Sequence, residues 1–335
     1  MGRARAGDRA KGNRPRNLHP LALTRPHPIP ISPFLHFSIS PSTPQINLFL
    51  RVTARRPDGY HDLASLFHII DLGEAMTFEV LPPGSATDEL LCDEPGVPTD
   101  DTNLAIKALD LFRSKTGSTA HYRVTLDKRV PHGAGLGGGS GNAATALWAA
   151  NELAGRPASA ADLGAWAGGI GSDISVFFSR GAAYCTGRGE VVEDVPPPLP
   201  LGTPLLLVKP PEGLATPAVF KALDLESRSS ADPVALAAGL ASSGRASPDL
   251  CVNDLEAPAF SLMPDLAAFR ARLAAEPAFD AVFMTGSGST VVGVGSHAAP
   301  AWLGSDPAYE GWFVGRARLC GREEGAWYAA PAEEA

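Results

Sequence analysis

The stretch PHGAGLGGGSGNAATALWAANEL, residues 131–153, places a glycine-rich loop before a helical pattern. Residues 121–130 before the loop alternate between apolar and polar side chains, which predicts a half-exposed strand that pairs antiparallel rather than parallel. From residue 143 onward, apolar side chains recur at helical spacing. The loop therefore joins a strand to the N-terminus of a helix.

This setting favours a phosphate-binding loop. A helix N-terminus offers unbonded backbone N–H groups and a partial positive charge, and glycines let phosphate oxygens approach the backbone closely. A P-loop of the GxxxxGK[ST] type is excluded, because no Lys-Ser or Lys-Thr follows the glycines. GAGLGG formally matches a dinucleotide-binding corner, but the alternating strand before it argues against that fold. A flexible linker would have unpatterned flanks.

Composition describes an acidic protein with a basic N-terminal segment. The 335 residues suffice for two domains, and the net charge is −8 although residues 1–44 alone carry +6. The acidic remainder argues against non-specific binding of nucleic acid, and no apolar run is long enough to predict a membrane span. Residues 1–44 are typical of a transit peptide or of a mispredicted exon, and they are expected to be disordered. The four cysteines are too far apart for a metal site and predict isolated, reduced thiols.

Local patterns predict the elements along the rest of the chain. Strands are expected at residues 46–52, 75–81, 205–211, 279–284 and 291–295, and helices at 103–117, 216–225 and 264–276, the first of them capped by Asp101 or Thr102. Residues 82–101 are predicted to be a loop. The proline-rich residues 192–204 indicate a domain boundary, and residues 227–250 are predicted to be a poorly patterned connection.

Two further features favour phosphoryl transfer. GIGSDI places Asp173 after a Gly-Ser corner, where a carboxylate could take the proton of a substrate hydroxyl. MTGSGST, residues 284–290, is a second glycine-serine loop between strands that could lie against the first. Taken alone, the aspartate could be a helix cap and the second loop a hairpin turn.

Taken together, these motifs resemble the GHMP kinase superfamily, whose phosphate loop has the form Pro-x-Gly-x-Gly-Leu-Gly-(Gly)-Ser. Within it, the chain is similar to the 4-diphosphocytidyl-2-C-methyl-D-erythritol kinases, in particular their plant and algal members. The segments that carry this similarity are INLFLRVTARRPDGYHDLASLF, LDKRVPHGAGLGGGSGNAATALWAANEL, IGSDISVFFSRGAAYCTGRGE, CVNDLEAPAF and AVFMTGSGSTVVGVGS. They span residues 46 to about 296.

The resemblance implies a two-domain α+β fold. Residues 45–195 would form an ATP-binding domain like the second domain of ribosomal protein S5, and residues 196–335 a ferredoxin-like domain. The implied reaction is ATP-dependent phosphorylation of the 2-hydroxyl of 4-diphosphocytidyl-2-C-methyl-D-erythritol, in the methylerythritol phosphate route to isoprenoids, in the plastid. Mg²⁺ is expected with ATP. No nucleic-acid or membrane partner is expected.

The resemblance also implies roles for individual residues. Asp173 would be the general base. Tyr60 would stack on cytosine and His61 would bond its edge, as an aromatic ring and an imidazole are suited to do. The implied ATP-binding residues are Asn103, Lys128, Pro131, Gly133, Gly135, Leu136, Gly137, Gly138, Gly139 and Ser140. The implied substrate-binding residues are Asn47, Tyr60, His61, Thr216, Phe220, Gly286 and Ser287. Another small-alcohol kinase, of the homoserine or mevalonate type, is the alternative within the superfamily, and DGYH favours the cytidylated substrate.

One position departs from the family. The resemblance implies a lysine immediately before Ile-Asn-Leu, beside the catalytic aspartate, and this chain has Gln45 there. Losing a preorganised cation at a developing negative charge costs on the order of 3 kcal/mol, or a hundredfold in rate. This predicts either a catalytically impaired nucleotide-binding homologue or an error in the assigned exon that ends at Gln45.

Overall fold

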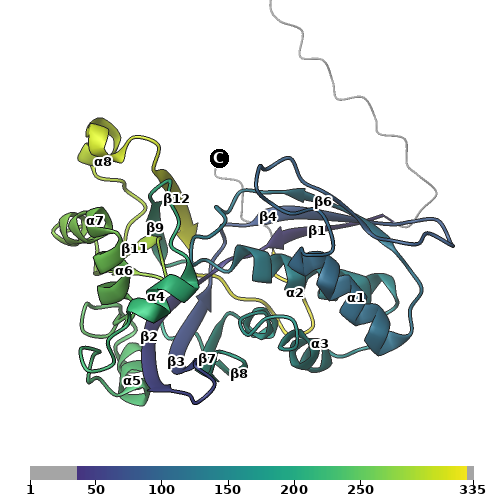
Figure 1. The fold of residues 1–335 in the computed structure, drawn as a ribbon, viewed down its shortest axis with the longest axis horizontal. Coiled ribbons are helices and arrows are strands. Elements are labelled where there is room, and N and C mark those ends of the chain that lie inside the picture. The colour runs from purple at the N-terminus through teal and green to yellow at the C-terminus, as the bar shows by residue number, and fades with distance from the viewer. Residues whose placement is uncertain (1–35, 330–335) are drawn as a thin grey trace, which may run out of the picture. The chain divides into compact units, whose positions relative to one another are not determined.

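The computed structural model describes residues 36–329, with side chains from residue 42 onward (Figure 1). The described strands form three four-stranded sheets. The first has the order β1-β4-β6-β5, the second β2-β3-β7-β8 and the third β10-β11-β9-β12. Together with the helices they form the expected α+β fold. The division into domains of residues 45–195 and 196–335 stays a prediction.

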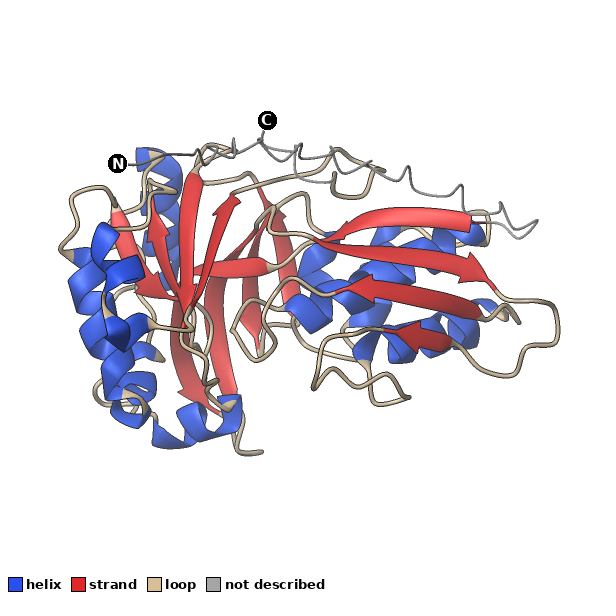
Figure 2. Ribbon diagram, turned by 90° about the horizontal axis from the view of Figure 1, so that it is seen from above, coloured by secondary structure: helices blue, strands red, loops and turns tan. Residues whose placement is uncertain are grey.

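The first sheet contains the strand that leads into the glycine loop. Its strands are β1 (His36–Ser42), β4 (Glu74–Val80), β6 (Tyr122–Asp127) and β5 (Glu89–Leu91). β6 pairs antiparallel with β4, as its alternating pattern predicts. It also pairs in parallel with β5, a short strand inside the segment predicted to be a loop. Figure 2 shows helices lying behind these strands.

The helices that cover the first sheet are α1 (Leu104–Thr116), α2 (Gly138–Leu153) and α3 (Ala160–Ala167), and the short 3₁₀ helix η1 (Ser175–Phe178) follows α3. α2 begins within the glycine run, earlier than the apolar pattern suggests. Every residue from Ser140 to Asn151 is buried, so α2 is an internal helix enclosed by its neighbours. The N-terminus of α2 therefore has a fixed position in the protein.

α1 begins at a different cap from the one predicted. The N-cap is Asn103, whose side-chain oxygen accepts a hydrogen bond from the backbone of Ala105 at 2.9 Å. Thr102 does not cap, because its hydroxyl and its backbone N–H both donate to Asp100 in the preceding turn. The prediction of Asp101 or Thr102 as the cap is therefore wrong, whereas the predicted end of the helix at Gly117 is confirmed.

The second and third sheets are antiparallel throughout. The second consists of β2 (Gln45–Arg55), β3 (His61–Ile69), β7 (Ala182–Gly187) and β8 (Val191–Val195), and the third of β10 (Ala281–Met284), β11 (Val291–Val294), β9 (Pro204–Lys209) and β12 (Phe313–Arg318). Apolar side chains of β2 pack with those of β9, β10 and β11 in shared buried clusters. The two sheets thus share a core.

The later helices are α4 (Thr216–Ala222), α5 (Pro233–Ser243), α6 (Glu256–Leu262), α7 (Pro264–Ala274), α8 (Ala301–Ser305) and the 3₁₀ helix η2 (Pro307–Tyr309). α5 lies where an unpatterned connection was predicted, and that prediction is wrong. Asp232 accepts hydrogen bonds from the first backbone N–H groups of α5, and Leu236 and Leu240 are buried one turn apart. Only two leucines form the apolar stripe of α5, and the alanines and serines around them hide its helical spacing in the sequence.

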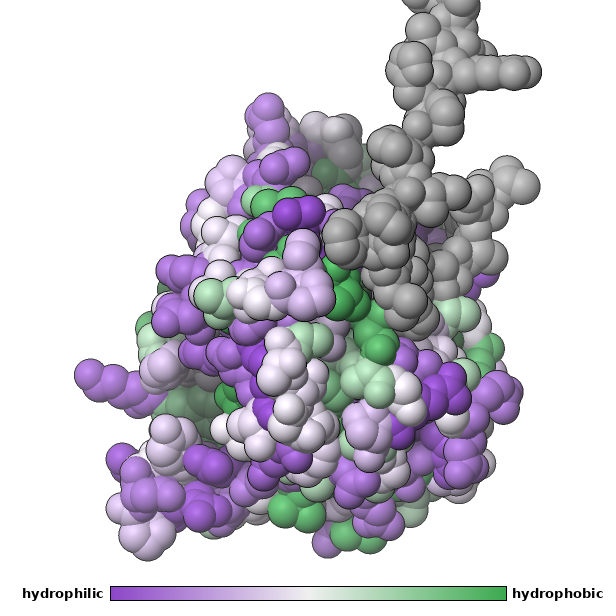
Figure 3. Space-filling view, turned by 90° about the vertical axis from the view of Figure 1, so that its right-hand side faces the viewer, coloured by the Kyte–Doolittle hydropathy of each residue, from purple (hydrophilic) through white to green (hydrophobic). Residues whose placement is uncertain are grey.

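The surface agrees with a protein whose apolar side chains are mostly internal. On the face drawn in Figure 3, hydrophobic residues lie in small groups among hydrophilic ones. No helix in the described part of the chain has the length and apolar character needed to cross a bilayer. All four cysteines are free thiols, and Cys185 and Cys251 are buried.

Candidate active site

The first glycine loop forms one wall of a cavity of about 350 Å³, here called the loop cavity. Gly137, with a φ of +64°, is the N-cap of α2, so the free N–H groups of this helix lie at the cavity wall. All ten residues predicted to bind ATP line the cavity. They are Asn103, Lys128, Pro131, Gly133, Gly135, Leu136, Gly137, Gly138, Gly139 and Ser140. No aspartate or glutamate is among the described residues that line it.

Lys128 lies beside this helix N-terminus, in an ion pair with Glu74. A Cβ atom built on Gly138 would lie 3.2 Å from its ammonium nitrogen. The ammonium group pairs with Glu74, and the side chains of both residues are buried. Glu74 also accepts a hydrogen bond from the backbone of Val130 at 2.9 Å, so it fixes both the lysine and the start of the loop. Because Glu74 balances the charge of Lys128, the free N–H groups at the start of α2 are the main attraction for an anion in the loop cavity.

Asp173 lies at the far end of the loop, in the turn between α3 and η1. The hydroxyl of Ser140 donates a hydrogen bond to its Oδ1 atom at 2.8 Å. Burial raises the pKa of Asp173, while this hydrogen bond acts in the opposite direction. A carboxyl group with a raised pKa is a stronger proton acceptor when it is ionised, which suits a general base. The structure thus brings together two residues that are 33 positions apart in the sequence.

The second glycine loop lies against the first, as expected. A Cβ atom on Gly135, whose φ is +72°, would lie 2.6 Å from the carbonyl oxygen of Thr285 and 3.0 Å from that of Gly288. The backbone N–H of Thr290 donates to the carbonyl of Ala134. Only a residue without a side chain allows the two backbones to approach so closely.

Asn253 holds the second glycine loop through hydrogen bonds of its side chain. The sequence predicted no role for this residue. Its side-chain amide donates to the carbonyl oxygens of Met284 and Gly286, at 2.7 and 2.8 Å. The next residue, Asp254, forms a buried ion pair with Arg51 on β2 at 2.9 Å. The segment CVNDLE therefore ties the second loop to the second sheet. Its only signal in the sequence was its place among the resembling segments.

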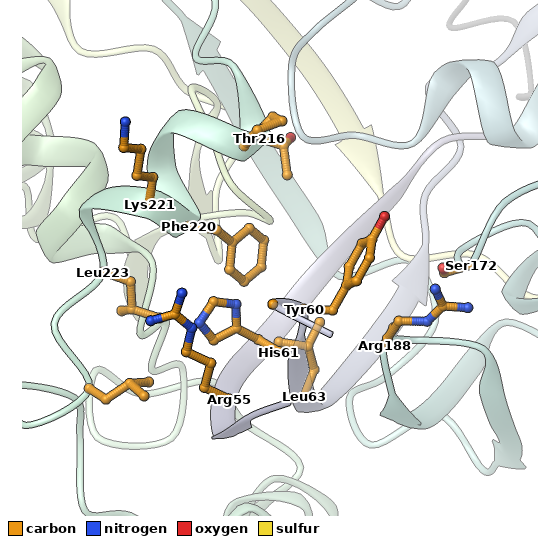
Figure 4. Close-up of a pocket in the computed structure, with 13 residues that line it drawn as sticks. Arg55, Tyr60, His61, Leu63, Ser172, Arg188, Thr216, Phe220, Lys221 and Leu223 are labelled. Atoms are coloured by element: carbon orange, nitrogen blue, oxygen red, sulfur yellow. The ribbon is translucent and has the colours of Figure 1, made fainter. Parts of the chain in front are cut away.

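A second cavity, of about 610 Å³ and here called the aromatic cavity, lies beside α4 (Figure 4). Its wall contains Tyr60, His61, Thr216 and Phe220, four of the seven residues predicted to bind the substrate. The rings of His61 and Phe220 stack with their centroids 5.2 Å apart, whereas Tyr60 is 59% exposed. An exposed aromatic ring at a cavity wall is available to stack on a ligand.

The other three predicted substrate residues do not line the aromatic cavity. Ser287 shares a hydrogen bond of 2.7 Å with Thr216, which links the second glycine loop to α4. Gly286 lies in the same loop. Asn47 is buried on β2, where its amide donates to Ser65 at 2.8 Å and its backbone N–H donates to Thr285 at 2.9 Å. Ser287 thus connects the second glycine loop to α4, and Asn47 connects it to the second sheet.

The aromatic cavity is rich in positive charge. Arg55, Arg188 and Lys221 line it, and no carboxylate is among its described lining residues. Burial lowers the pKa of His61, and the charge of Arg55 lowers it further, so the imidazole is neutral near pH 7. Sequence reasoning missed these cations, although Arg188 belongs to the resembling segment that ends in TGRGE. Ser172, the neighbour of Asp173, also lines this cavity.

Gln45 is buried at the start of β2, with 3% of its surface exposed. Its backbone N–H donates to the carbonyl of Leu136 at 2.9 Å, and its side-chain nitrogen lies 2.8 Å from where a Cβ atom of Gly137 would be. Its side-chain oxygen has no hydrogen-bond partner. The residue therefore contacts the loop at the N-terminus of α2, but it brings no charge there.

Comparisons with known proteins agree with this geometry. Residues 103–181 match the model of the GHMP kinases N terminal domain. The chain is 53% identical over 289 residues to the chloroplastic 4-diphosphocytidyl-2-C-methyl-D-erythritol kinase of Oryza sativa subsp. japonica, a match that covers 86% of this chain and 72% of that protein.

Solved structures extend the comparison. A crystal structure of a 4-(cytidine 5'-diphospho)-2C-methyl-D-erythritol kinase superposes with a TM-score of 0.66 at 32% identity, covering 85% of this chain and 99% of that one. The mevalonate kinase of Methanococcus jannaschii shares the fold, with a TM-score of 0.59, at 10% identity; the match covers 87% of this chain and 100% of that one. The chain therefore belongs to the GHMP kinases and, within them, to the family of 4-diphosphocytidyl-2-C-methyl-D-erythritol kinases.

Proposed function

We propose that the protein transfers the γ-phosphoryl group of ATP to the 2-hydroxyl of 4-diphosphocytidyl-2-C-methyl-D-erythritol, giving the 2-phosphate and ADP. The relative from rice is named for this kinase and as chloroplastic, which supports the same reaction and a plastid location here. The reaction belongs to the methylerythritol phosphate route to isoprenoid precursors.

One observation carries the proposal. The hydrogen bond from Ser140 to Asp173 links the wall of the loop cavity to the residue that follows Ser172 in the wall of the aromatic cavity. Ser140 lines the loop cavity, which is suited to the phosphates of ATP. Ser172, which precedes Asp173, lines the aromatic cavity, which is suited to a nucleobase and a polyanion. A substrate held in the aromatic cavity would reach Asp173 with its alcohol, next to the end of the phosphate loop.

The residues then have separate roles in one step. Asp173 accepts the proton of the substrate hydroxyl as the oxygen attacks the γ-phosphorus, and the bond from that phosphorus to ADP breaks. The N–H groups at the start of α2 and the ammonium of Lys128 stabilise charge on the phosphate oxygens. Tyr60 and Phe220 hold the cytosine, and the neutral His61 hydrogen-bonds to its edge.

Mg²⁺ fits this site as a companion of ATP. The described residues contain no group of three His, Cys, Asp or Glu side chains that could hold a metal alone. Mg²⁺ in kinases needs only one or two protein ligands, because the phosphates and water supply the rest. The Ser140 hydroxyl donates its proton to Asp173, and the lone pairs of its oxygen would remain for the ion. The ion would neutralise charge on the phosphates.

The test is turnover by the purified protein. With ATP, Mg²⁺ and the cytidylated substrate, we expect ADP in a coupled assay and a new phosphomonoester by phosphorus NMR. Mevalonate and homoserine should give no ADP above background, and Asp173→Asn should lose at least a hundredfold in kcat. Turnover of either competitor in preference, or full turnover by the variant, would overturn the proposal.

Gln45 motivates the second candidate, a nucleotide-binding homologue with impaired catalysis. The comparisons give no support to this candidate. It predicts that the protein binds ATP and the substrate but releases no ADP. The same assay, combined with calorimetric titration of both ligands, distinguishes it from the kinase.

A further inference from the structure

Arg188 lies at the tip of the turn between β7 and β8, where strand pairing brings it next to Tyr60. Gly187 at the end of β7 pairs with Leu63 of β3, three residues after Tyr60. The guanidinium carbon of Arg188 lies 5.3 Å from the centroid of the Tyr60 ring. In Figure 4, Tyr60 lies between Phe220 on one side and Arg188 on the other. The face of Tyr60 that is turned toward Phe220 remains available to a base.

The same turn adjoins the segment that carries Asp173. A Cβ atom on Gly189 would lie 3.9 Å from the carbonyl oxygen of Ser172. Arg188 and Ser172 line the aromatic cavity together, and Figure 4 shows them on the same side of Tyr60. The guanidinium group therefore contacts the ring that would stack on the base, on the side of that ring where the residue preceding the general base also lies.

The guanidinium charge of Arg188 is only weakly paired with carboxylates of the protein. Its one carboxylate neighbour among the described residues is Glu190, at 3.8 Å from Nε, and 41% of the arginine side chain is exposed. Arg55 and Lys221, the other cations of the cavity, form no ion pair in the part of the chain that the structure describes. A ligand with negative charge would meet no competing carboxylate on the cavity wall.

We propose that Arg188 is a specificity-determining residue that binds the diphosphate of the substrate. This inference rests on the proposed function: the diphosphate joins the cytidine to the methylerythritol, so it must lie between Tyr60 and Asp173. Arginine suits this position, because its planar fork donates two parallel hydrogen bonds to phosphate oxygens and stacks on aromatic rings. The contact with Tyr60 orients the fork toward the diphosphate.

Competitive inhibition by CDP and by cytidine separates a diphosphate contact from support of the tyrosine ring. In Arg188→Met, we expect the inhibition constant of CDP and the KM of the cytidylated substrate to rise about tenfold. The inhibition constant of cytidine, the KM for ATP and kcat should stay within twofold. Arg188→Lys keeps the charge without the fork, so its loss should be intermediate.

Arg180→Met is the matched control, because Arg180 is an exposed arginine that precedes β7 and pairs with Asp194, away from the cavity. It should change none of these constants. Equal weakening of CDP and cytidine in Arg188→Met, or no weakening of CDP, would overturn the inference. If Arg188→Met does not fold, the ratio of the inhibition constants of CDP and cytidine in Arg188→Lys decides the question instead. Failure of the wild-type protein to bind CDP would instead overturn the proposed function.

Discussion

Replacing Gly135 by alanine tests whether the two glycine loops touch as described. Gly135 has a φ of +72°, and an added Cβ atom would lie 2.6 Å from the carbonyl oxygen of Thr285. Real Cβ atoms do not come so close to backbone oxygens, so one loop must move. Overpacking of this kind costs about 1–3 kcal/mol, and the positive φ adds about 1–2 kcal/mol for an L-residue.

Gly133→Ala supplies the matched control. Gly133 has a similar φ of +62°, but a Cβ atom there would meet nothing within 4 Å. It should therefore lose only the conformational part of the stability, about 1–2 kcal/mol. The difference between the two variants isolates the contact between the loops, about 1–3 kcal/mol.

Urea unfolding, followed by tryptophan fluorescence, measures both free energies, and ATP titration measures the effect on the loop cavity. We expect Gly135→Ala to be the less stable variant and to bind ATP more weakly than Gly133→Ala. Equal losses of stability in the two variants would show that the second loop does not lie against Gly135, and the geometry of the site would then be wrong.

Substitutions at Asp173, Gln45 and Arg322 probe three further features, and Gln45→Met and Arg316→Ala are controls. Burial raises the pKa of Asp173 in the folded protein above that of the unfolded chain, so the wild type loses stability as the pH rises above about 4, the usual pKa of an aspartate. Asp173→Asn should therefore be inactive yet more stable than the wild type at neutral pH, and calorimetric melts that show no such gain would contradict the assigned pKa direction. Gln45→Lys should raise kcat about a hundredfold, because it restores a cation beside the developing negative charge, and Gln45→Met should not raise it. An unchanged kcat in Gln45→Lys would show that a cation at this position does not assist phosphoryl transfer. Arg322 donates hydrogen bonds to the carbonyl oxygens of Phe178 and Ser179 at the end of η1. Arg322→Ala should therefore lower the free energy of unfolding in urea by about 2 kcal/mol, whereas Arg316→Ala, at an exposed position, should lower it by less than about 0.5 kcal/mol. Equal losses in the two variants would contradict the role of Arg322 in holding η1.

The sequence predicted those parts of the site whose signals are local. The glycine loop, the strand before it and the helix after it follow from patterns within some thirty residues, and all three are present. The ten residues predicted to bind ATP were chosen by family resemblance, and they line one cavity because most of them belong to that single continuous loop. Local patterns are reliable here because backbone conformation decides the structure of a loop between a strand and a helix.

Features that depend on distant partners were not predictable in this way. Asn253 donates hydrogen bonds to carbonyl oxygens 31 and 33 residues away, and no pattern within CVNDLE predicts these bonds. Arg188 reaches Tyr60 only through the register of β3 with β7. In each case the decisive contact joins segments whose separation hides it from a window-based pattern.

The charge distribution explains how an acidic protein can bind a polyanionic nucleotide. The net charge of −8 repels anions at long range, but screening in physiological salt limits this repulsion to roughly 8 Å. Within that distance a ligand in the aromatic cavity meets Arg55, Arg188 and Lys221, and one in the loop cavity meets the N-terminus of α2. A positive region of this size matches a few phosphates and not an extended strand. We therefore expect selection for small nucleotides to come from the extent of the cationic surface as well as from contacts with the base.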